Sequence, residues 1–94
     1  MANSVISAPL QIHEITVYPE NKTTDIHIPY PDGFNASNTM IVDIATLLYQ
    51  QWYTQADVRF NILTSLTGSY INLGLSGIDD RIIGKPVKIM IIHV

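Results

Sequence analysis

The chain has 94 residues, enough for one domain that buries about 65% of the surface its unfolded form exposes. Hydrophobic residues make up 47% of the sequence and charged residues only 14%, against roughly 25% in typical soluble domains, so part of the apolar surface is expected to lie between subunits. The net charge of −3, with five scattered Lys and Arg residues, predicts no nucleic-acid partner, and the absence of cysteine excludes disulfides and thiolate metal sites.

The N-terminal residues 1–9 are predicted to be a flexible or docking arm in front of a single β domain over residues 10–94. The chain start lacks a charged segment followed by an apolar run, and no apolar stretch approaches ~18 residues. These features predict a chain that is neither secreted by the general pathway nor inserted in a membrane.

The first two strands are predicted on either side of Pro19. Residues 10–18 are rich in β-branched and aromatic side chains, and residues 24–30 alternate apolar with polar side chains, as a half-buried strand does. The segment Tyr30–Gly33 then supplies a turn, because Pro presets φ and Gly accepts a positive φ.

Residues 39–53 fit two structures. The apolar residues of Met40–Ile44 alternate as in a strand, whereas those of Ile41–Leu48 also fit one face of a helix with Asn38 as its N-cap. We favour the strand.

Two further stretches, residues 57–64 and 69–75, alternate cleanly. The residues between them, 65–68, are predicted to form a hairpin connection, which makes the arrangement a meander. Residues 78–81 are predicted to be a loop.

The final strand, residues 85–94, is strongly apolar and runs to the last residue without a tail. Because an exposed apolar strand can add another chain along its edge, this strand must lie inside a sheet, of this chain or of a neighbour. Short strands separated by Gly and Pro predict an all-β fold, a single-domain antiparallel β sandwich of jelly-roll-like or barrel-like form. The residues predicted to be buried are Ile26, Ile28, Val58, Phe60, Ile62, Ile71, Leu73, Val87, Ile89 and Ile91.

Metal ligands of ordinary type occur at His13, Asp25 and His27, and Asp25 and His27 share one strand face. A third ligand would have to come from another strand, such as His93, or from another subunit. We expect surface histidines and no bound metal or cofactor, with three copies of one His on a trimer axis as the alternative.

Catalytic residues are not indicated by any spacing in the chain. Asp79 and Asp80 are adjacent and are expected to lie in a solvated turn, and no Gly-x-Ser-x-Gly elbow is present. The chain is therefore predicted not to be an enzyme.

A candidate carbohydrate site is formed by Tyr49, Trp52 and Tyr53, which are flanked by glutamines. Flat rings stack on sugars, and amides contact hydroxyl groups. The same aromatic side chains could equally lie in the core or in an interface.

The segment Thr24–Val42, with its Tyr30-Pro31-Asp32-Gly33-Phe34 turn, and the apolar final strand Val87–Ile92 resemble a small β domain of minor structural and tail-fibre proteins from phages and prophages of Gram-positive bacteria. The resemblance covers roughly residues 23–94. In that family the domain commonly ends a much longer fibre or baseplate protein, whereas about twenty residues precede it here.

The resemblance implies a non-enzymatic virion structural protein, made in the bacterial cytoplasm and exposed on the phage particle as a tail-tip, fibre-head or decoration element. It also implies a homotrimer that docks on other virion proteins through residues 1–18 and takes part in particle assembly or host attachment. The alternative is a carbohydrate-binding adhesin or receptor-binding module that contacts a host-surface glycan through Tyr49, Trp52 and Tyr53.

Overall fold

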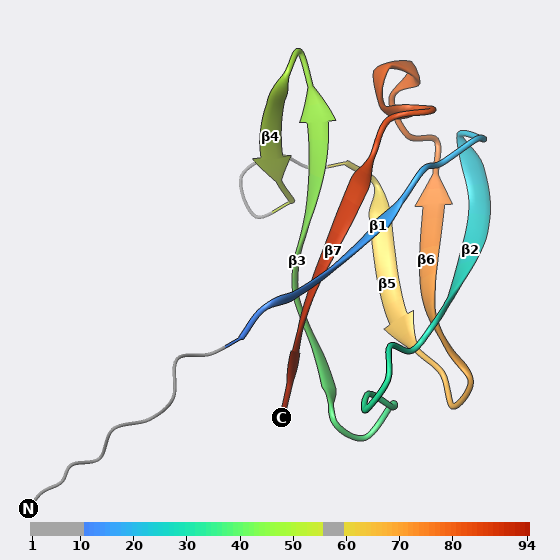
Figure 1. Ribbon diagram of the computed structural model, residues 1–94. Helices are drawn as coiled ribbons and strands as arrows, with labels where there is room; N and C mark the ends of the chain where they lie inside the picture. Colours follow the sequence, from blue (N-terminus) through green and yellow to red (C-terminus); the bar gives the residue numbers. More distant parts are fainter. Residues whose placement is uncertain (1–10, 56–59) are drawn as a thin grey trace, which may run out of the picture.

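The computed structural model describes residues 11–55 and 60–94, which form seven strands in two antiparallel sheets (Figure 1). The two sheets pack face to face as an open sandwich, not a closed barrel, which confirms the predicted all-β class and antiparallel sandwich. The strands are β1 His13–Val17, β2 Thr23–Pro29, β3 Thr39–Leu48, β4 Gln51–Thr54, β5 Ile62–Leu66, β6 Tyr70–Ser76 and β7 Val87–His93. The predicted arm lies outside the described residues, and no described helix is long and apolar enough to cross a membrane.

The sheet order corrects the predicted meander. One sheet, here called sheet A, has the order β1-β7-β3-β4, and the other, sheet B, has the order β2-β6-β5. Only β3–β4 and β5–β6 are neighbours both in sequence and in space, because the chain otherwise crosses between the sheets (Figure 1). Each crossing lets a strand bury its apolar face against the opposite sheet instead of exposing it beside its predecessor.

The final strand lies inside a sheet, as predicted. β7 pairs with β1 through His13↔Ile91 and with β3 through Ile44↔Ile89, so both of its edges are used. Its inward residues Val87, Ile89 and Ile91 are fully buried. The strand at greatest risk of aggregation is therefore the one with two partners.

Residues 39–53 form strands, which removes the helical alternative. β3 continues to Leu48, and β4 returns after a two-residue turn in which Tyr49 and Gln50 have φ of 50° and 67°. A β-bulge at Val42 shifts the register of β3 against β7.

The core confirms most of the predicted buried residues. Ile26 is only half-buried but packs against the core, and Val58 lies outside the described residues. The buried core contains Ile28, Ile44, Phe60, Ile62, Ile71, Leu73, Leu75, Ile78, Ile82, Val87, Ile89 and Ile91.

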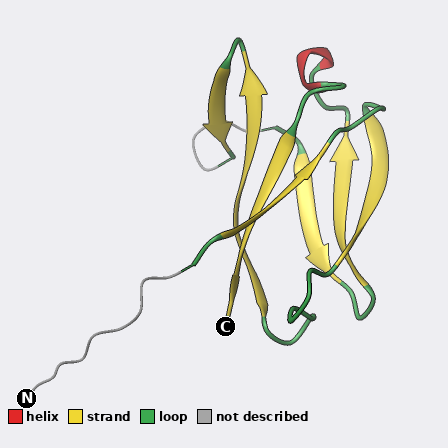
Figure 2. Cartoon of the chain, in the orientation of Figure 1, coloured by secondary structure: helices red, strands yellow, loops and turns green. Residues whose placement is uncertain are grey.

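Two predicted boundaries change. β5 begins at Ile62, after Asn61 with φ of 60°, and it runs to Leu66, so the hairpin turn lies two residues later than expected. The predicted loop over 78–81 contains the start of a short 3-10 helix, η1, Asp80–Ile82, shown in red in Figure 2. Asp79 caps this helix, since its side chain accepts a hydrogen bond from the Arg81 N–H, and Ile82 is buried in the core.

Candidate functional site

The outer face of sheet B is mostly polar. In β2 the residues that alternate with buried Ile28 point outward, and among them His27 stacks on Tyr70 of β6 with ring centroids 3.9 Å apart. Next to this pair, the Asn72 side-chain amide donates to Asp25 Oδ1 at 3.5 Å. Asp25 and His27 therefore share a face, as predicted, and each contacts a neighbouring side chain of β6, Asn72 for Asp25 and Tyr70 for His27.

The outer face of sheet A carries an apolar row at one end. Met40 of β3 lies directly opposite Ile92 of β7, and Ile12 precedes β1 on the far side of β7. Met40 is 54% exposed, and Ile12 and Val42 are similarly exposed. We call Ile12, Met40, Val42 and Ile92 the apolar row. Such a row fits contact with an apolar surface of another chain.

The candidate carbohydrate residue Tyr49 lies in the β3–β4 turn and is 76% exposed. Arg81 Nη1 donates to the Tyr49 hydroxyl at 2.6 Å, which ties the turn to η1. Arg81 also pairs with Asp79 through contacts of 2.8 and 2.6 Å. These bonds hold the pKa of Asp79 well below its usual value, and Asp79 with Tyr49 raises the pKa of Arg81.

Trp52 and Tyr53 point to opposite faces of sheet A, because successive residues in a strand alternate. Trp52 is 42% exposed on the outer face, where Lys88 Nζ lies 4.3 Å from its ring centroid. Tyr53 packs partly against the core, and its hydroxyl donates to Gln51 Oε1 at 2.8 Å. The structure therefore does not join the three predicted aromatic residues into one stacking platform.

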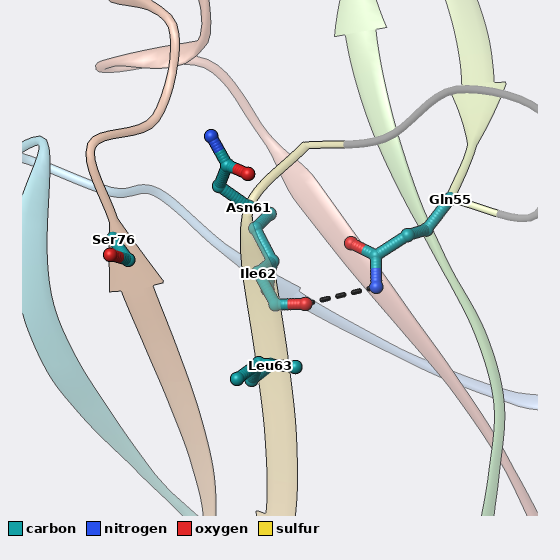
Figure 3. Close-up of a pocket in the computed structure, with 5 residues that line it drawn as sticks. All are labelled: Gln55, Asn61, Ile62, Leu63 and Ser76. Carbon is teal, nitrogen blue, oxygen red and sulfur yellow. Dashed lines mark hydrogen bonds between the residues drawn. The ribbon is translucent and has the colours of Figure 1, made fainter.

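Gln55 is a polar residue that the sequence did not single out. Its Nε2 donates to the Ile62 carbonyl at 2.9 Å, which connects the end of β4 with β5 (Figure 3). Its Oε1 is buried and has no hydrogen-bond partner among the described residues. Gln55 lines a depression with residues of β5 and β6, shown in Figure 3, and a second depression along β3 with Thr64 and residues 41–44.

The histidines lie in two separate places. His13 and His93 both contact the ring of Phe34, with centroid distances of 5.3 and 5.7 Å, at one end of the sandwich. His27 lies on the outer face of sheet B, against Tyr70. Within residues 11–55 and 60–94, no three histidine or acidic side chains gather as a metal site would require.

The fold and these surfaces define the class of protein as a small two-sheet antiparallel β sandwich. Comparisons with protein-family models, with curated proteins and with solved structures found no match to the chain.

Proposed function

We propose that this chain is a non-enzymatic structural protein of a phage particle that works by assembling with copies of itself, most simply as a homotrimer. In this role it is exposed on the virion as a tail-tip, fibre-head or decoration element, and it contacts other virion proteins. The phage context is supported by the sequence resemblance over residues 23–94.

The observation that carries the assembly role is the contrast between the two outer faces. The apolar row places Met40 beside Ile92 on sheet A, whereas the corresponding face of sheet B presents Asp25, His27 and Asn72. An apolar group left in water costs about 25 cal/mol for each Å² that association could cover. Covering this row with a second copy therefore favours an oligomer.

The first experiment is the solution mass of the purified full chain by light scattering at micromolar concentration. We expect three times the chain mass of 10.5 kDa. A mass of 10.5 kDa at every concentration would remove the assembly role, and a dimer would reject the threefold arrangement. Imaging of an intact particle then tests the virion location, since density for the sandwich must appear on its surface.

A second function, carbohydrate binding, is favoured by the exposure of Tyr49. Its ring borders a depression lined also by Gln50, Arg81 and Lys85, side chains that can donate hydrogen bonds to sugar hydroxyls. A glycan-binding assay with Tyr49→Ala tests this function. The matched control is Tyr18→Ala, because Tyr18 is also an exposed tyrosine but lies near β1. Loss of binding in both variants, or in neither, contradicts the assignment.

A further inference from the structure

β3 has a long edge that its hairpin partner covers only in part. β4 pairs with Ala45–Leu48, and the ladder extends one step further through the Gln55 N–H, which donates to the Ile44 carbonyl at 2.7 Å. Along Thr39–Asp43, no residue of the described ranges pairs with this side of β3. Figure 1 shows β4 beside only the upper part of β3. Within the described part of the chain, five residues of this strand edge are thus open to a new strand.

The side chains around this edge favour the addition of a strand. Met40 and Val42 expose apolar side chains there, and a depression follows residues 41–44. The buried Gln55 Oε1, which lacks a hydrogen-bond donor among the described residues, lines the same depression. A docked main chain carries N–H groups that could supply this donor.

The upper limit of the open edge is also defined. The Ile44 N–H donates to Asp43 Oδ1 at 2.8 Å, so this amide is already satisfied where the pairing with β4 ends. A docking segment therefore has room for about five residues, from Thr39 to Asp43.

We propose that residues Ser4–Ala8 of a second copy add to sheet A as a strand along Thr39–Asp43. This inference rests on the proposed self-assembly and names the contact that performs it. The segment Ser-Val-Ile-Ser-Ala has the same length as the open edge, carries no charge, and contains the β-branched residues Val5 and Ile6. Pro9 then ends it, since proline cannot donate to a ladder.

The position of β1 in the sheet favours a second copy over the chain's own segment. β1 is the opposite border of sheet A, and His13, Ile91 and Ile41 lie in one row across it. A strand added at the open edge would therefore lie about 14 Å from His13, or three strand spacings of roughly 4.8 Å. The link from Ala8 to His13 spans at most about 17 Å, which leaves little length to pass over the side chains of β7 and β3.

Such a contact is head-to-tail, because each copy donates a segment and accepts another. A head-to-tail contact either closes into a ring or grows into a filament. The expected trimer corresponds to closure after three copies.

Chemical cross-linking between two kinds of full-length chain tests the inference, and the natural absence of cysteine keeps the background low. Copies with Ile6→Cys are co-expressed with copies with Val42→Cys and treated with a short bis-maleimide that tolerates a one-residue slip in register. We expect a product of twice the 10.5 kDa chain mass. It should form about tenfold faster than the product of Ile6→Cys with the control Tyr18→Cys, because docking raises the local concentration.

The outcomes separate the inference from the proposed function. The inference is overturned if Ile6→Cys links equally fast to Val42→Cys and to Tyr18→Cys. It is also overturned if a double variant, with Ile6→Cys and Val42→Cys in the same chain, links only within that chain. Absence of linking in a chain of trimeric mass overturns the inference but leaves self-assembly intact, whereas a monomeric mass removes both. If Val42→Cys lowers the melting temperature, Met40→Cys takes its place on the same edge.

Discussion

The two sheets have similar inner faces and different outer faces. Inside, alternating isoleucine, leucine and valine side chains from both sheets form one core. Outside, sheet B is mostly polar, with Leu63 as its isolated exposed apolar residue, whereas sheet A gathers the apolar row at one end and has the open edge of β3. The inner faces therefore account for folding, and the difference between the outer faces is the basis of the proposed contact with a second copy.

The largest expected effect comes from a mutation in the core that the two sheets share. Phe60→Ala should lower the free energy of unfolding by ~3–5 kcal/mol, because Phe60 is buried in the core and its removal leaves a cavity. Urea denaturation measures the change. Leu63→Ala is the control, since Leu63 is 78% exposed and should change stability by less than about 0.5 kcal/mol. Similar midpoints for Phe60→Ala and the parent would mean that the register of this segment is wrong.

The next effect distinguishes the two outer faces. Met40→Lys places a charge in the apolar row and should raise the dissociation constant of the oligomer about a hundredfold, because the charge loses water without gaining a partner. Leu63→Lys makes the same change on sheet B and should leave the mass unaltered. Light scattering over a dilution series measures both, and dissociation by Leu63→Lys alone would assign the interface to the other face.

A smaller effect of opposite sign is expected on the inner side of sheet A. Thr46 is fully buried, and its hydroxyl has no hydrogen-bond partner in the described part of the chain. Thr46→Val should therefore raise the free energy of unfolding by about 1 kcal/mol, since the desolvated hydroxyl is replaced by a methyl group of similar size. Thermal unfolding checks the sign, and a lower melting temperature would show that the hydroxyl is bonded.

The smallest effect concerns the exposed pair of Asp79 and Arg81. The pKa of Asp79 lies below its ordinary value of 3.8, so the ionised carboxylate stabilises the fold above that pH. This contribution is lost as the pH falls below 3.8 towards the pKa of the folded state. Asp79→Asn should thus lower the melting temperature slightly at pH 7, and the gap should shrink in acid. A gap that is constant with pH would assign the effect to the capping of η1.

Alternation in the sequence was sufficient to predict the buried faces of β6 and β7, because burial of every second side chain is a local property of a strand. It could not predict that β7 lies between β1 and β3, since the choice of partner depends on residues far apart in the chain. The turn at Tyr49 and Gln50 was also hidden, because neither residue is one of the usual carriers of positive φ.

The candidate carbohydrate site could also be predicted only in part, because local patterns do not report contacts between distant residues. Once the segment is known to be a strand, alternation separates Trp52 from Tyr53, but a helix would have placed them differently. The Arg81 contact with Tyr49 joins residues 32 positions apart, and no local sequence pattern predicts it. Gln55 had no distinctive spacing, and its unpaired oxygen is visible only in the assembled sandwich.

The central place of β7 also sets the order in which the molecule can fold. The β3–β4 and β5–β6 hairpins join near neighbours and can form early, whereas the pairing of His13 with Ile91 must bring together residues 78 positions apart. Because β7 lies between β1 and β3, β1 cannot join the rest of sheet A until this distant contact forms. Folding of such a topology is expected in roughly milliseconds to seconds, with closure by β7 as the slow event.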